Sequence, residues 1–458
     1  MNGIRSPSDG VKFWPSQIGV IDEELPYTGS PWKLLQSEMK LIWGLKFFAL
    51  GVLFPWRWKE PDPMDELYLN WTNIKTLSIH AVLFVWQTIF LVSLPVAFVG
   101  ALFMPGLIYV IYVAIFFLVN GLLCRVLNGS EAMLTSQVDI KDHSKDEKEY
   151  WIFINGVAVG RDWLQSNIDR LSLTFGRKIT GVHNPTSGIL FDLVQCLVQR
   201  TLCFYTQDVR DAYTSIKRTL QDDSYVRVVF ILHSQGGIEG GLVVDWLLNS
   251  VPHDVLHKLE IYTFGNAANH FNNPHRTLSA LRNEQRDKAA KSDSHAKIIR
   301  HIEHYANAGD FVSQYGVCNF IDTPMRFMGR LFMAPSSGHL LNSHYLHSMF
   351  PLTPDRTAAE DVNEFMEMEV SFTATGEEHA TREGLRESFT STFGGGDNEL
   401  AGGGPHGSVA FLRDVNSPIK RTISFPDSPV AKDRVGRAPR VRDFSRLWLY
   451  RNGRTPPM

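Results

Sequence analysis

The chain has 458 residues, enough for two or three structural units and at least one sizeable core. Its formal net charge is −3, which argues against a nucleic-acid-binding protein because such proteins carry basic contact surfaces. The four cysteines are too few for a disulfide framework and none forms a CxxC pair, which favours a reducing compartment.

The N-terminal region, residues 1–75, has no early apolar run, so no signal peptide is expected. Its first 40 residues mix charges, prolines and glycines, and we expect them to be irregular. Residues 41–56 are apolar but short, and Lys46 lies among them. This pattern favours a helix at a membrane interface over one that crosses the membrane.

Residues 76–124 form the most apolar stretch of the chain and contain no Asp, Glu, Lys or Arg. About 20 apolar residues suffice to span a bilayer, so the stretch has room for two spans. The sequence Met104-Pro105-Gly106 interrupts it with a turn signal. The sequence therefore predicts a helical membrane hairpin with arms at 77–103 and 107–124.

Two arrangements of this hairpin stay open, a full crossing of the bilayer and a dip into one leaflet. Both leave the two ends on the same side. Positive charges flank the hairpin at Arg57, Lys59, Lys75 and Arg125, so the domain that follows the hairpin and both termini are expected in the cytoplasm. A buried hairpin of a soluble core is the third interpretation, which the length of the apolar run disfavours.

Strands and helices alternate over residues 150–352, after a charged linker. Such alternation indicates parallel βαβ units, hence an α/β domain with a mostly parallel sheet flanked by helices. The expected strands are 151–155, 179–182, 227–232, 259–264 and 297–305, and the expected helices are 162–175, 188–203, 206–220 and 237–249.

The last segment, residues 354–458, is polar, rich in glycine and basic at its end. From residue 411 onward it has 11 Lys and Arg against 4 Asp. Such a composition does not bury enough apolar surface to offset the entropy of ordering, so we expect a disordered basic tail. The tail is either solvated or bound to anionic lipid.

Leu232-His233-Ser234-Gln235-Gly236 lies where the expected strand 227–232 turns into the expected helix 237–249. This placement is typical of a nucleophile elbow, which presents a serine hydroxyl above the sheet and needs small residues on either side. Gly236 meets that need, whereas Leu232 stands where the usual motif has glycine. The departure indicates a shifted helix, a compensating small residue opposite, or an inactive site. Capping the helix is the alternative role of Ser234.

A serine nucleophile needs a base and an acid that orients the base, in the chain order Ser, acid, His. Asp310 is the preferred acid because it follows the expected strand 297–305, with Asp322 and Asp245 as weaker rivals. His344 is the preferred base and His339 the alternative.

Backbone N–H groups of an oxyanion hole are expected from Gln235 and from Gly156 or Val157, which follow an early strand. A plain turn is the other interpretation of the Gly156 segment. No HExxH or GxxxxGK[ST] motif is present, so neither a metal nor another cofactor is expected.

Four landmarks, 229–237, 262–266, 307–312 and His344-Tyr345, resemble those of lipase-like α/β-hydrolases over residues 150–352. The pattern is similar to class 3 lipases and serine-esterase-like families, including membrane-anchored fungal members with an HSQGG elbow. The resemblance implies Ser234 as nucleophile, Asp310 as acid and His344 as base. Asn155 stands where many of these proteins have histidine before the oxyanion glycine.

These features lead to a membrane-anchored serine hydrolase that cleaves an ester or thioester of a lipid-derived acyl group. The alternative is a catalytically weak or inactive scaffold that recruits partners at a membrane. Transfer of the acyl group to an acceptor other than water is a third possibility.

Overall fold

The computed structural model describes residues 10–16, 29–45, 62–100, 102–103, 105–140, 148–277, 279, 297–323, 326–372 and 438–456. Residues 46–56 of the expected interfacial helix and residues 373–437 of the expected tail lie outside the described residues.

A nine-stranded, mostly parallel sheet organises the domain, with the strand order β2-β4-β3-β5-β6-β7-β8-β1-β9. The strands from β4 to β8 in this order run parallel, whereas β2 and β1 pair antiparallel with β4 and β8. The strands are β1 Val11–Trp14, β2 Met133–Thr135, β3 Glu149–Ile154, β4 Ile179–Val182, β5 Arg227–His233, β6 Leu259–Phe264, β7 His301–Asn307, β8 Arg330–Ala334 and β9 Val370–Phe372.

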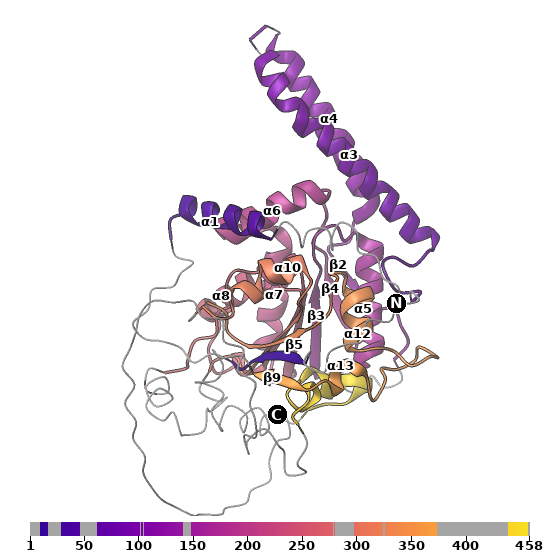
Figure 1. Ribbon diagram of the computed structural model, residues 1–458, viewed down its shortest axis with the longest axis vertical. Coiled ribbons are helices and arrows are strands. Elements are labelled where there is room, and N and C mark those ends of the chain that lie inside the picture. Colours follow the sequence, from indigo (N-terminus) through magenta and orange to yellow (C-terminus); the bar gives the residue numbers. More distant parts are fainter. Residues whose placement is uncertain are drawn as a thin grey trace, which may run out of the picture.

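Helices cover both faces of this sheet, as Figure 1 shows. Alternation along β3 sends Trp151 and Phe153 into one core with α5, and Ile152 and Ile154 into another with α7 and α8. The helices of the domain are α1 Pro31–Gly44, α5 Arg161–Phe175, α6 Ile189–Leu202, α7 Gln207–Leu220, α8 Gln235–Ser250, α10 Phe311–Tyr315, α11 Val317–Phe320, α12 His347–Met349 and α13 Glu364–Glu367. The three-layer α/β architecture that the sequence predicts is therefore confirmed, with the five expected strands and four expected helices inside it.

The hairpin consists of α3 (Trp71–Gly100) and α4 (Gly106–Asn128), which project from the domain in Figure 1. Both helices are long and apolar enough to cross a membrane. Only 17% of the most apolar stretch of each helix is buried, unlike the core hairpin of a soluble protein. Pro95 lies inside α3, and the two helices pack along their length through stacked rings such as Phe90 and Phe116.

The two ends of the described chain are more ordered than their composition indicates. Residues 11–14 form a strand of the sheet and residues 31–40 are helical, in a region expected to be irregular. The same helix continues through residues 41–44, the start of the expected interfacial helix. Residues 354–372 and 438–456, expected to be disordered, include β9 and the 3-10 helices Val441–Asp443 and Leu447–Gly453. The expectation is wrong for these parts because most of their large apolar residues are buried, among them Phe444, Leu447, Trp448 and Tyr450.

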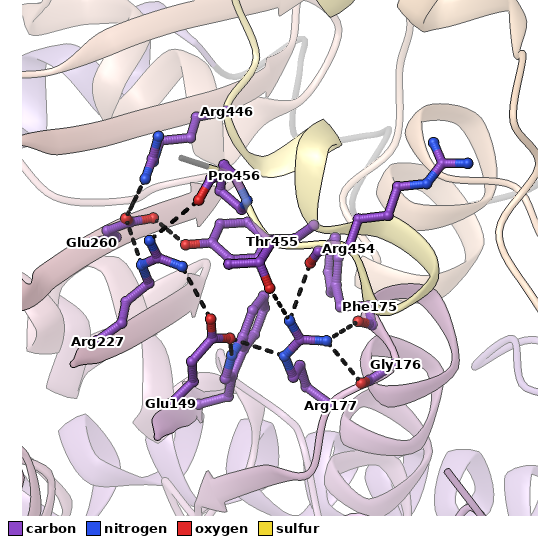
Figure 2. A network of polar contacts seen from close by, with 12 residues as sticks. Glu149, Phe175, Gly176, Arg177, Arg227, Glu260, Arg446, Arg454, Thr455 and Pro456 are labelled. Atoms are coloured by element: carbon purple, nitrogen blue, oxygen red, sulfur yellow. Dashed lines mark hydrogen bonds and ion pairs between the residues drawn. The ribbon is translucent and has the colours of Figure 1, made fainter. Parts of the chain in front are cut away.

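A buried network of charges holds this last segment to the amino ends of the strands (Figure 2). Glu149 accepts hydrogen bonds from Arg177 Nε at 2.9 Å and Arg227 Nη1 at 3.0 Å. Glu260 pairs with Arg227 Nε at 3.1 Å and with Arg446 Nη2 at 2.9 Å. Two carboxylates thus pair with three guanidinium groups, and the charge of Arg446, which belongs to the last segment, is matched by Glu260 inside the fold.

Glu260 makes stability depend on pH. Burial alone would raise the pKa of Glu260, but the guanidinium groups of Arg446 and Arg227 outweigh burial and hold that pKa well below its usual value. The charged form therefore stabilises the fold above about pH 4.3, the ordinary pKa of Glu, and this contribution is lost as the pH falls toward the folded-state pKa.

We expect Glu260→Gln to lower the free energy of unfolding by about 3–5 kcal/mol at pH 7, because the buried guanidinium groups of Arg446 and Arg227 both lose their ion pair with this carboxylate. The difference from the parent protein should shrink at pH 3. Thermal unfolding of both proteins in detergent at the two pH values measures it, and a constant difference would contradict the prediction.

Candidate active site

Ser234 lies at the sharp turn between β5 and α8. Its backbone adopts φ 59° and ψ −122°, a left-handed conformation that is strained for a residue other than glycine. The Ser234 N–H donates to the Phe264 carbonyl at 3.1 Å, and the Ser234 carbonyl accepts from Gly237 and Ala267. The side chain makes no helix-capping bond, so the capping role considered from the sequence does not apply.

Glycines allow α8 to approach the sheet closely at this turn. A Cβ atom on Gly236 would lie 2.6 Å from the Ile154 carbonyl oxygen, and one on Gly240 would lie 2.2 Å from Leu232 Cδ1. The large Leu232 side chain thus occupies space left by Gly240, one turn further along the helix. Of the three interpretations of Leu232, a compensating small residue opposite is the one that the structure has.

We expect Gly240→Ala to destabilise the fold by about 1–3 kcal/mol through overpacking against Leu232. Adding Leu232→Ala should restore part of that loss, because the two side chains compete for one space. The matched control is Gly241→Ala, where the nearest atom would lie at an ordinary 3.5 Å. Thermal unfolding of Gly240→Ala, Leu232→Ala, their combination and Gly241→Ala measures the coupling. Purely additive effects of the first two substitutions would contradict it.

The structure joins Ser234, His339 and Asp310 by hydrogen bonds. His339 Nε2 lies 2.8 Å from Ser234 Oγ, and His339 Nδ1 lies 2.9 Å from Asp310 Oδ2. The three side chains come from the end of β5, from the loop after β8 and from the turn after β7, so the parallel sheet gathers them at its carboxyl edge. In this geometry the imidazole is placed to take the proton of the serine hydroxyl.

Asp310 is held in its charged form. Burial raises the pKa of Asp310, but the neighbouring His339 and hydrogen bonds from His339, Tyr345 and the Val312 N–H together hold it below its usual value. The Tyr345 hydroxyl donates at 2.7 Å and the Ser313 hydroxyl at 3.0 Å, both to Oδ2. A charged Asp310 accepts the Nδ1–H of His339, which leaves Nε2 as the acceptor for the serine proton.

His344, the base preferred from the sequence, lies on the same loop but does not join this chain of hydrogen bonds. Its Nδ1 accepts the backbone N–H of Leu340 at 3.0 Å, inside the irregular π-helical turn Leu341–Leu346. The structure thus gives His339, the alternative base, the position between Ser234 and Asp310. Spacing alone did not distinguish the two histidines, because both follow Asp310 in the chain order and lie only five positions apart.

The rival acids make other contacts. Asp322 accepts from Trp14 Nε1 at 2.7 Å, and Asp245 contacts His270 and Asn272. Neither has a contact to His339 among those that the structure records.

Reasoning from the sequence missed the role of His233, which contacts His339 through a hydrogen bond and through ring stacking. Its Nε2 lies 2.8 Å from the His339 carbonyl oxygen and the two rings stack with centroids 4.8 Å apart. Because a carbonyl only accepts, this nitrogen is the donor. Burial, together with the nearby His339, lowers the pKa of His233 to about 3, so the ring is neutral at pH 7. The position of His233 next to Ser234 in the sequence was the available signal.

Glu66 was also missed. It connects the segment before the hairpin to the loop that carries His339 and His344. The buried carboxylate accepts from the Asn342 N–H at 2.9 Å, the Ser343 N–H at 3.0 Å and the Ser343 hydroxyl at 2.6 Å, and from Asn167 Nδ2 at 3.1 Å. No sequence pattern points to this contact, because 276 positions separate Glu66 from Asn342.

The residues expected to form the oxyanion hole lie around Ser234. A Cβ atom on Gly156 would lie 2.4 Å from Ser234 Cβ, so only glycine fits there. Asn155 is bound to the loop after β4 through both polar atoms of its side-chain amide. It accepts from the Asn184 N–H at 2.9 Å and donates to the Asn184 carbonyl at 3.0 Å. Val157 follows in the same turn, and Gln235 begins α8 directly after the nucleophile.

Comparisons with protein-family models, with curated proteins and with solved structures find no match to this chain. Within the part of the chain that the structure describes, no group of three or more His, Cys, Asp or Glu side chains is arranged to hold a metal ion.

Proposed function

We propose that this protein is a membrane-anchored serine hydrolase of the lipase-like α/β-hydrolase type, which cleaves an ester or thioester. The observation that carries the proposal is the continuous hydrogen-bond chain from Ser234 Oγ through His339 to the charged Asp310. The strained backbone of Ser234 at a strand–helix turn supports it independently, because a merely structural serine needs no such conformation.

The reaction follows from these positions. Ser234 Oγ attacks the acyl carbon while His339 Nε2 takes the hydroxyl proton, and Asp310 stabilises the resulting imidazolium. Backbone N–H groups of Gln235 and of Gly156 or Val157 would stabilise the negative oxygen of the tetrahedral intermediate. Collapse expels the alcohol or thiol, which receives the proton from His339 and leaves an acyl ester on Ser234.

Water then completes the cycle. His339 takes one proton from the water molecule as its oxygen attacks the acyl carbon, and the carboxylic acid leaves as Ser234 Oγ recovers the proton. The two helices of the hairpin are long and apolar enough to cross a membrane, which supports chemistry beside a bilayer, so a lipid-derived acyl ester is the substrate class that we favour. By the distribution of positive charge, the domain and both termini would face the cytoplasm.

The alternative of an inactive scaffold was motivated mainly by Leu232, and Asn155 was a second departure from the family pattern. Since Gly240 accommodates the side chain of Leu232, Leu232 no longer argues against an active site. We therefore favour catalysis over a purely structural role.

A fluorophosphonate probe tests the proposal, because it labels only a serine whose hydroxyl is activated. Full-length protein in detergent should be labelled, and Ser234→Ala should not. A second variant, Ser250→Ala, is a control that keeps the nucleophile, because this exposed serine lies at the other end of α8. Absence of labelling in folded full-length protein would refute the hydrolase and leave the scaffold.

A further inference from the structure

Helix α6 has its polar and apolar sides reversed relative to an ordinary surface helix. Asp192, Gln199 and Arg200 are buried, whereas Leu193 and Val194 are 52% and 57% exposed. A surface helix in water normally turns its apolar side inward. The reversal indicates that the outer side of α6 does not face water.

Polar contacts fix α6 in this orientation next to the candidate active site. Gln199 accepts from Gln235 Nε2 at 2.8 Å, and Gln235 follows the nucleophile directly. Asp192 accepts from the Ala158 N–H at 3.0 Å, at the end of the expected oxyanion loop. Arg200 donates to the carbonyls of Ala267 and Tyr315, at 2.6 and 2.8 Å. These contacts hold the polar side of α6 against the domain, and the apolar side therefore points outward.

Helix α1 extends the same apolar surface. The buried pair Glu38–Arg200, 3.1 Å apart, links α1 to α6. Trp32, Met39 and Trp43 lie 7 and 11 positions apart, hence on one side of α1, and are 46–72% exposed. Tryptophan at such positions is typical of a membrane interface.

Figure 1 shows α1 and α6 across the end of the domain from which the hairpin rises. Leu202, the last residue of α6, and Phe204, which follows the helix, are exposed too. We use the name "leaflet face" for the exposed apolar residues Trp32, Met39, Trp43, Leu193, Val194, Leu202 and Phe204.

The leaflet face is continuous with the hairpin. Gln87 of α3 and Asn120 of α4 donate to the Ser187 carbonyl at 2.7 and 3.2 Å, just before α6 begins. The ring of Phe191 on α6 lies 5.9 Å from that of Phe116 on α4. The domain therefore flanks the hairpin as far as these residues.

The remaining tip of the hairpin is short. Beyond Gln87, α3 continues through residues 88–100. At about 1.5 Å per residue these 13 residues extend about 20 Å, less than the ~30 Å hydrocarbon core of a bilayer but more than half of it. The tip can enter one leaflet but not cross the bilayer unless the flanking domain enters as well.

We infer that the leaflet face lies in the headgroup region of one phospholipid leaflet, while the hairpin tip enters the hydrocarbon of that leaflet. The carboxyl edge of the sheet, with Ser234, then faces the membrane. The position of the domain follows from these contacts, whereas delivery of an ester from the leaflet to Ser234 rests on the proposed function.

Spin labels on full-length protein in phosphatidylcholine–phosphatidylserine vesicles test the position without any activity. One nitroxide is placed at Leu193→Cys with the exposed Cys203 changed to serine, and the control is placed at Val226→Cys near the other end of β5. We expect the label at 193 to be reached by oxygen and protected from an aqueous nickel chelate, and the label at 226 to show the opposite. Equal access of nickel to both would overturn the inference.

Phe103 lies in the turn between α3 and α4, and a Phe103→Cys variant tests the depth of the tip. A membrane-impermeant maleimide should fail to label it from the side opposite the domain. Labelling from that side would mean a full crossing and would overturn the single-leaflet arrangement.

The consequence for catalysis has its own test. Leu193→Asp/Val194→Asp should keep fluorophosphonate labelling and hydrolysis of a soluble short-chain ester, and lose at least about tenfold in hydrolysis of an ester within vesicles. The matched control is Val226→Asp/Val362→Asp, two exposed apolar residues outside the leaflet face. Equal vesicle activity of the two double variants would overturn the inference, whereas inactivity of the parent protein on every ester would refute only the proposed function.

Discussion

Replacing His339 with alanine is expected to lower kcat for ester hydrolysis by about 10⁴-fold or more, whereas His344→Ala should keep the rate within about tenfold of the parent. His339 lies between Ser234 and Asp310, at 2.8 and 2.9 Å from their side-chain oxygens. His344 supports its loop through the Leu340 N–H, and loss of one such hydrogen bond costs about 1–3 kcal/mol of stability.

Steady-state hydrolysis of a soluble ester measures this difference, with thermal unfolding to show that each variant is folded. Asp310→Asn provides an intermediate case, because it favours the wrong tautomer of His339 and should cost about 10⁴-fold. If His344→Ala were as inactive as Ser234→Ala while His339→Ala stayed active, the roles assigned to the two histidines would be reversed.

The centre of the fold was predictable from the sequence because its signals are local. Strand 227–232 is a continuous apolar run, as parallel strands buried on both faces are, and a serine between it and a helix marks an elbow. Asp310 was predictable for the same reason, since acids after parallel strands point to the shared edge. The compensation of Leu232 by Gly240 has a local signal as well, four glycines in the first two turns of α8.

What could not be predicted depends on partners far apart in the chain. Strand β1 pairs with β8 at Phe13 and Phe332. The periodicity of four residues is too short to predict a strand or its partner. The choice of His339 depends on a π-turn held partly by Glu66, from the other side of the hairpin. Composition misjudged residues 438–456 because it counts Arg446 as a solvated charge, whereas Glu260 neutralises it inside the fold.

That last segment leads to the second large effect. We expect a chain ending at residue 437 to lose its cooperative unfolding, because Phe444, Leu447, Trp448 and Tyr450 are all buried in the core. At about 1.5–3 kcal/mol for each such side chain, their burial contributes about 6–12 kcal/mol, which matches the entire stability of a typical domain. Removal of Arg446 also leaves Glu260 with a single guanidinium partner.

Point variants separate this effect from simple shortening of the chain. Leu447→Ala should lower the free energy of unfolding by about 2–5 kcal/mol, whereas Arg454→Ala, with a half-exposed side chain, should change it by about 0.5 kcal/mol or less. Tyr450→Phe removes only the hydroxyl that donates to Glu260 at 2.7 Å and should fall between them. A truncated chain that unfolds at the parent temperature would show that the segment is dispensable. Loss of cooperative unfolding in the truncated chain would mean that the amino ends of the strands need this final segment. The strained turn at Ser234, at the other end of β5, would then depend on it through the fold as a whole.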